Sequence, residues 1–91
     1  MELTRFRVSP GKAGRLLAAR PAMIEDFQAD RTGFLGAKLV RVSDDEWLDI
    51  VEWRSGDDFA ASRAKGANLP GILGFFDLID EVVSVEEGTV P

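Results

Sequence analysis

The sequence predicts an α+β fold with the element order β-α-β-β-α-β. This is the ferredoxin-like arrangement, in which a four-stranded antiparallel sheet carries its helices on one face. Three observations support this fold class: strand-like alternation recurs four times, helical patterns fall in the two intervals that this order requires, and the central pair of strands is apolar on both faces. At 91 residues the chain has room for one such domain, which we place at residues 1–91.

The first strand and the first helix are predicted from the N-terminal third of the chain. Residues 3–8 alternate in polarity as a half-buried strand does. Ser9 and Pro10 then form a helix start, with Ser9 as the N-cap and Pro10 in the first helical position. Apolar side chains recur at helical spacing from Ala13 to Phe27, which predicts one buried stripe along this helix.

Pro21 interrupts the predicted first helix. Proline has no backbone N–H, and its ring clashes with the carbonyl four residues earlier, here that of Leu17. We therefore expect a kink or a break near Arg20. Residues 31–33 end the helix and lead into the next strand.

Residues 33–54 predict a hairpin of two strands joined by a short acidic turn. We pair Val42 with Trp47 across the turn, which places Trp53 opposite Gly36. In this register both faces are largely apolar, whereas a sheet with one solvated face alternates between apolar and polar residues. Because little of the chain remains to cover the second face, we expect it to bind a second copy of the chain and form a homodimer.

The second half of the chain predicts two short helical segments and a last strand. Ser55 can cap a helix that continues through residues 59–65 and stops at Gly66. A further helical start at residues 68–70 leads into a strongly apolar segment. Residues 81–86 then predict the fourth strand.

The charge balance limits the partners of the chain. It has 11 basic and 16 acidic residues, for a formal net charge of −5. An acidic protein of this kind is a poor partner for nucleic acid and for anionic membranes. No apolar run is long enough to span a bilayer, and no signal-peptide pattern precedes the first strand. We therefore expect a cytoplasmic protein that binds neither nucleic acid nor membrane.

The chain contains no cysteine, histidine or tyrosine. Without cysteine it can form no disulfide and no thiolate metal site. Without histidine it lacks the side chain best suited to proton transfer near neutral pH and the commonest transition-metal ligand. We expect no metal site, and we interpret the acidic residues 44–46 as a solvated turn.

Three short motifs, in their order and spacing, resemble the antibiotic biosynthesis monooxygenase (ABM) family of the dimeric α+β barrel superfamily. They are Val8-Ser9-Pro10-Gly11-Lys12 after the first strand, Gly33-Phe34-Leu35-Gly36-Ala37 in the second, and Trp53-Arg54-Ser55 followed by Phe59 after the third. The resemblance extends from Leu3 to about Val85. It implies a homodimer whose two sheets form a barrel, with a pocket in each subunit between the sheet and the helices.

The resemblance also implies a choice of functions. Some relatives oxygenate aromatic polyketides or quinols without metal or flavin, so the first hypothesis is a cofactor-independent monooxygenase with a small aromatic or quinol substrate. The haem-degrading branch uses a histidine that this chain lacks, and Thr4 stands where that branch has an asparagine. The alternatives are a non-catalytic module that binds a small ligand or another protein, and a cofactor-free isomerase or lyase, since no catalytic base is identified.

Six side chains are candidates for substrate binding: Trp53, Arg20, Arg63, Asn68, Phe27 and Phe76. Trp53 matches the tryptophan of the family and could stack on a planar substrate, and Arg63 and Asn68 could stabilise an enolate or a carbonyl. Each has a structural alternative. Trp53 could pack in the core or at the dimer interface, Arg63 and Asn68 could serve as a helix C-terminal charge and an N-cap, and Arg20 could form a salt bridge. Phe27 and Phe76 could belong to an ordinary core.

Overall fold

The structure, a computed structural model, describes all 91 residues. Its elements are β1 (Glu2–Arg7), a 3-10 turn (Pro10–Lys12), α1 (Ala13–Asp30), β2 (Phe34–Arg41), β3 (Glu46–Trp53), α2 (Gly56–Lys65), α3 (Pro70–Phe76) and β4 (Glu81–Glu87). The four strands form one antiparallel sheet in the order β2-β3-β1-β4. The predicted α+β, ferredoxin-like fold class is therefore confirmed.

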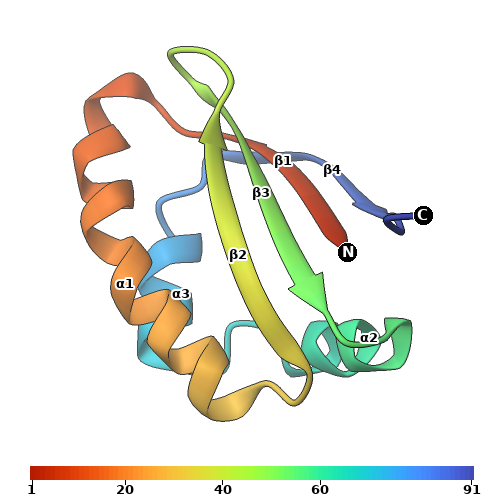
Figure 1. The fold of residues 1–91 in the computed structure, drawn as a ribbon. Coiled ribbons are helices and arrows are strands. Elements are labelled where there is room, and N and C mark those ends of the chain that lie inside the picture. Colours follow the sequence, from red (N-terminus) through yellow and green to blue (C-terminus); the bar gives the residue numbers. More distant parts are fainter.

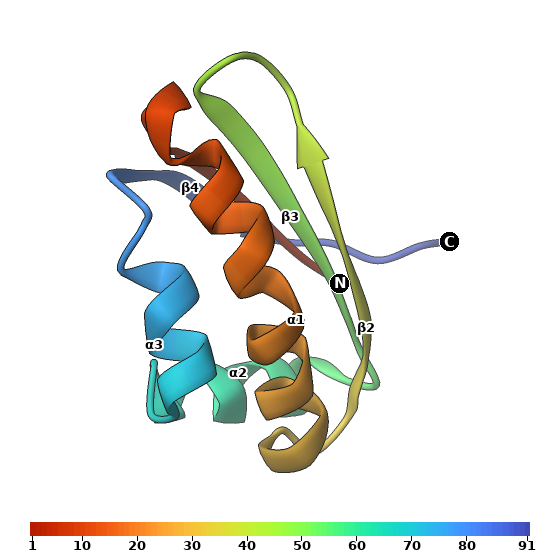
Figure 2. The same cartoon turned by 90° about the vertical axis from the view of Figure 1, so that its left-hand side faces the viewer.

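The three helices lie on one face and at one end of the sheet. Helices α1 and α3 pack side by side on a single face, while α2 lies at the end of the sheet where β3 leaves it (Figures 1 and 2). No element covers the other face. None of the helices is long and apolar enough to cross a membrane.

The register of the β2–β3 hairpin differs from the predicted one by a single residue. Trp47 pairs with Arg41 rather than with Val42, because the backbone N–H groups of both Val42 and Ser43 donate to the carbonyl of Glu46 and enlarge the turn. Since side chains alternate between faces, this shift exchanges the two faces of β2. As a result Ala37 and Leu39 pack against the core.

The predicted pairing of Trp53 with Gly36 is also wrong. An irregularity between Phe34 and Gly36 brings Trp53 opposite Phe34, and Gly36 instead pairs with Glu52. Gly36 has φ +156°, a backbone angle that suits glycine at such an irregularity. The indole of Trp53 thus packs on another aromatic ring and does not fill a space above a glycine.

The predicted start of the first helix holds in part, and the predicted break is not observed. Ser9 is the N-cap residue of the 3-10 turn and Pro10 is its first residue, but the hydroxyl of Ser9 makes no capping hydrogen bond and donates to Asp80 instead. Helix α1 runs without a break through Pro21. Both Pro21 and Leu17 are exposed, so the carbonyl that loses its N–H partner lies on the solvent side of the helix. By contrast, Ser55 caps α2 as predicted by accepting a hydrogen bond from the backbone N–H of Asp58.

The core lies between the sheet and the two helices that cover it. Phe6, Leu16, Met23, Ile72 and Phe75 are its most deeply buried large side chains. Trp47 is also buried, beneath the guanidinium of Arg41. It shares its face with Asp49, Val51 and Trp53, because the odd-numbered residues of β3 face the helices throughout the strand.

Candidate functional site

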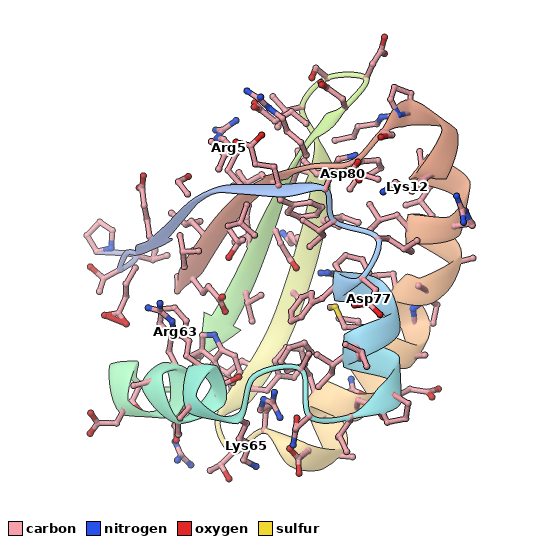
Figure 3. The ribbon with its side chains drawn as sticks, turned by 180° about the vertical axis from the view of Figure 1, so that it is seen from behind. Arg5, Lys12, Arg63, Lys65, Asp77 and Asp80 are labelled. Carbon is pink, nitrogen blue, oxygen red and sulfur yellow. The ribbon has the colours of Figure 1, made fainter.

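A cleft of about 440 Å³ opens between the sheet, α2 and α3. It exists because α3 packs against α1 while α2 stays at the end of the sheet, so neither helix covers β4. Val82 and Val85 of β4 consequently remain exposed. Figure 3 is viewed from this side, with Arg63 rising from α2 toward the sheet and Asp80 at the opposite end. The volume is typical of a small-molecule site, for which about 300–1,000 Å³ is usual.

Most of the residues that line the cleft are apolar. They are Phe6, Phe27, Val51, Phe75, Phe76, Ile79, Val82 and Val85, and the polar ones are Glu2, Thr4, Asp49, Arg63, Asp80 and Glu81. The aromatic rings come from α1, α3 and β1. A flat apolar molecule fits such walls, and the few polar groups can orient it.

Glu2 is a carboxyl group held inside this cleft by two neutral donors. The indole Nε1–H of Trp53 donates to Oε1 at 3.1 Å, and the hydroxyl of Thr4 donates to Oε2 at 3.3 Å. Burial raises the pKa of the Glu2 carboxyl, and the negative charge of Asp49 raises it further, against the two hydrogen bonds and Arg63, which lower it. Glu2 is therefore a stronger base than an exposed glutamate.

Trp53 itself belongs to an aromatic cluster and is absent from the lining of the cleft. It stacks on Phe59 with the ring centroids 6.3 Å apart. It also forms T-shaped pairs with Phe27 and Phe34, at centroid distances of 6.3 and 5.7 Å. Only its Nε1–H reaches the cleft, through Glu2. The geometry thus favours packing over substrate stacking for this side chain.

Arg20 forms the salt bridge that the sequence offered as its structural alternative. Its Nη1 and Nη2 donate to the two carboxylate oxygens of Asp49 at 2.7 and 2.8 Å, and its guanidinium lies 5.2 Å from the centroid of Phe75. Both side chains are largely buried, at 13% and 9% exposure. Arg20 therefore does not line the cleft itself. It affects the cleft by neutralising the charge of Asp49, which does line it.

The other four candidates separate into two groups. Phe27, Phe76 and Arg63 line the cleft, and Arg63 projects over Phe59 with 5.7 Å between its guanidinium carbon and the ring centroid. Asn68 does not line it. Its side chain accepts from Arg31 at 2.7 Å and donates to Asp30 at 3.1 Å. Asn68 is also not the N-cap of α3, since Leu69 occupies that position.

Five polar cleft residues were not among the sequence candidates: Glu2, Thr4, Asp49, Asp80 and Glu81. For Glu2, Thr4 and Asp49 the available signal was their position on strand faces. Asp49 lies two residues from both Trp47 and Val51 and so shares their buried face of β3. Glu2 and Thr4 share a face of β1 with the buried Phe6 for the same reason. A carboxylate on the buried face of a strand is unusual enough to mark a site.

The charged groups of the cleft are not equally available to a ligand. Asp49 is paired with Arg20, Asp80 with Lys12, and Glu81 with Arg7 at 3.5 Å. This leaves Glu2 and Arg63 as the two charged cleft residues without an ion-pair partner. One can accept a proton from a bound molecule, and the other can stabilise the negative charge that results.

The fold and this cleft define an α+β domain of the ferredoxin-like class with a ligand-sized site between its sheet and its helices. The family model described as antibiotic biosynthesis monooxygenase matches residues 1–69. The chain therefore belongs to the antibiotic biosynthesis monooxygenase family. A search of the curated proteins finds no match.

Solved structures of similar fold cover almost the whole chain. A candidate antibiotic biosynthesis monooxygenase from Bordetella bronchiseptica has a TM-score of 0.77 at 18% identity, over 98% of this chain and 95% of that one. SnoaB, a cofactor-independent oxygenase from Streptomyces nogalater, has a TM-score of 0.61 at 21% identity, over 99% and 92%. At these identities the likeness concerns the fold alone.

Proposed function

We propose that this protein is a cofactor-independent monooxygenase whose substrate is a small aromatic compound or quinol bound in the cleft. The observation that carries the proposal is the pairing of an apolar cleft with two free charged groups of opposite sign, Glu2 and Arg63. Family membership and the cofactor-independent oxygenase among the similar folds support the same reaction type.

Such a reaction needs little from the protein because the substrate supplies the electrons. Removing a proton from an anthrone-type methylene leaves a delocalised anion, which passes one electron to dioxygen. The substrate radical and superoxide then combine to form a C–O bond. Loss of the second methylene proton breaks the O–O bond and leaves a carbonyl and, after protonation, water. One methylene and one dioxygen thus give one carbonyl and one water.

The chain contributes a base, a cation and apolar walls. The base removes the first proton, Arg63 steadies the resulting anion, and the walls formed by Phe27, Phe75 and Phe76 limit the access of water. Guanidinium groups are well suited to this part because they stay protonated at every relevant pH.

The test is oxygen uptake by the purified protein with a panel of anthrones, naphthols and hydroquinones. We expect consumption of one dioxygen per product, and a product that carries one oxygen atom from ¹⁸O₂. Absence of turnover above background over the panel, together with tight binding of the same compounds, would instead support the non-catalytic binding module.

We also propose that a second copy of the chain covers the open face of the sheet. Leu3, Leu48 and Ile50 lie on that face, because their neighbours in β1 and β3 point toward the helices. An apolar patch of this kind normally has a partner. The cleft lies on the helical side and remains accessible in such a homodimer.

Sedimentation velocity can test this assembly. We expect the wild type to sediment as a dimer and Ile50→Lys to sediment as a monomer, because the lysine would place a charge in the apolar interface. Leu73→Lys is the matched control, since Leu73 is an exposed leucine of α3 on the opposite side. A monomeric wild type would contradict the proposal.

A further inference from the structure

We infer that Glu2 is the group that removes the proton from the substrate, and that Trp53 and Thr4 are positioning residues for its carboxylate. This inference rests on the proposed function and deepens it, because it supplies the base that a chain without histidine and tyrosine otherwise lacks. It also defines the substrate class: an aromatic molecule with a weakly acidic proton on a ring hydroxyl or a ring methylene.

The hydrogen bonds of Glu2 leave it free to act as a base. A carboxylate has about four lone-pair positions on its two oxygens, and only two of them are occupied here, by Trp53 and by Thr4. Neither donor carries a charge, so neither forms an ion pair that protonation would have to break. The remaining lone pairs are available to a hydroxyl or methylene proton in the cleft.

The surroundings of Glu2 favour proton transfer over permanent ionisation. Asp49 on β3 is a nearby negative charge, and Glu87 on β4 lies directly across from Glu2 in the sheet. Arg63 on α2 is the opposing positive charge. Burial and Asp49 strengthen the carboxylate as a base, while Arg63 lies on the same cleft to receive the negative charge that moves to the substrate.

Trp53 explains why the carboxylate is held in one orientation. Its ring is fixed by Phe27, Phe34 and Phe59, so its Nε1–H points in a direction set by the core. A hydrogen bond from a rigid donor fixes Glu2 Oε1 and leaves Oε2, which only the hydroxyl of Thr4 contacts, for the substrate.

The decisive experiment measures proton removal without oxygen. Anthrone is incubated anaerobically in D₂O with the protein, and ¹H NMR follows exchange of its methylene protons. We expect the wild type to accelerate exchange and Glu2→Gln to lose about 10²-fold or more of that acceleration, the usual contribution of a general base. Glutamine retains an oxygen that can accept the bond from Trp53, so the fold is preserved.

The matched control is Glu25→Gln, because Glu25 is an exposed glutamate of α1 that forms no salt bridge. It should exchange as fast as the wild type. Quenching of tryptophan fluorescence by anthraquinone, which has no acidic proton, should show that Glu2→Gln still binds a flat aromatic ligand. Loss of exchange together with retained binding is the result that supports the inference.

Two other results separate this inference from the proposed function. Exchange that depends on Glu2, without oxygen uptake in air, would retain the base and overturn the monooxygenase, leaving an isomerase-type activity. Oxygenation that survives Glu2→Gln with an unchanged pH profile would retain the monooxygenase and overturn the base. Exchange no faster than in buffer alone would also overturn the base.

Discussion

The indole Nε1–H of Trp53 donates a 3.1 Å hydrogen bond to the carboxylate of Glu2, and this bond joins the aromatic core to the cleft. Trp53 is 7% exposed and lies at the end of β3, while Glu2 begins β1 and lines the cleft. Their positions in the sequence, 51 residues apart, give no sign of this contact. In the fold, the orientation of the Trp53 indole fixes the Glu2 carboxylate and lowers its pKa.

Trp53→Phe should raise the pKa of Glu2 above its wild-type value. The bond from Trp53 lowers this pKa, so its loss leaves only burial, Asp49, Thr4 and Arg63 to act on the carboxyl. A hydrogen bond donated to the ionised form of a carboxyl group favours that form, so its loss favours the protonated form. A ¹³C NMR titration of the Glu2 side chain measures the shift directly.

Trp47→Phe is the matched control for this substitution. Trp47 is equally buried, at 3% exposure, but its Nε1 has no hydrogen-bond partner. Both variants lose part of a buried indole and should be destabilised by a similar amount, on the order of 1–3 kcal/mol. Only Trp53→Phe should move the titration of Glu2. An equal shift in both variants would mean that loosened packing, and not the hydrogen bond, sets this pKa.

The elements of the fold could be predicted because their signals are local. Ser55 caps a helix with its own neighbours, and Gly66, with φ +62°, ends it in a conformation that glycine adopts readily. The register of the hairpin could not be predicted in this way. It depends on whether Val42 belongs to the strand or to the turn, and one residue decides which face every side chain of β2 occupies.

The site was harder to predict than the fold because its contacts are distant in sequence. The charge of Arg20 on an apolar stripe required a partner, but Asp49 lies 29 residues away. Glu2 lies 51 residues before Trp53 and just outside the strand predicted from the pattern. Only the sheet order, which places β1 between β3 and β4, brings these groups to one cleft.

Breaking the ion pair between Arg20 and Asp49 should be among the most destabilising single changes. Asp49→Ala leaves a largely buried guanidinium without its partner, at a cost of about 3–5 kcal/mol. The double variant Arg20→Met, Asp49→Leu should recover most of this loss, since an apolar pair of similar size needs no compensation of charge. Urea midpoints measure both values, and a single-variant loss below about 1 kcal/mol would contradict the expectation.

The hydrogen bonds of the Asp80 carboxylate predict a loss of folding stability in acid. Hydrogen bonds from Lys12 and from the hydroxyl and backbone N–H of Ser9 lower the pKa of Asp80 from 3.8 to about 2. Because the pKa is lower in the folded state, the stabilisation is present above about pH 4 and disappears as the pH falls toward 2. Unfolding by urea should therefore show a steeper acid dependence in the wild type than in Asp80→Asn.

Asp44→Asn is the control for this pH dependence, since Asp44 lies in the exposed hairpin turn. It should follow the wild-type curve between pH 4 and 2, the range set by the pKa of Asp80. If Asp80→Asn and the wild type lose stability in parallel over that range, the contacts of Ser9 and Lys12 do not stabilise the folded carboxylate.

Gly71 and Gly74, three positions apart on α3, should respond to alanine in opposite directions. A Cβ at Gly71 would lie 2.5 Å from the carbonyl oxygen of Ala22, so alanine there forces α3 away from α1 at a cost of about 1–3 kcal/mol. A Cβ at Gly74 meets nothing within 4 Å, so Gly74→Ala should stabilise the protein by about 0.5–1 kcal/mol through its helix propensity. Because Phe75 and Phe76 on the same helix line the cleft, Gly71→Ala should also weaken the binding of a flat aromatic ligand. Thermal unfolding and fluorescence titration check the two effects, and equal behaviour of the two variants would show that α3 is not closely packed on α1.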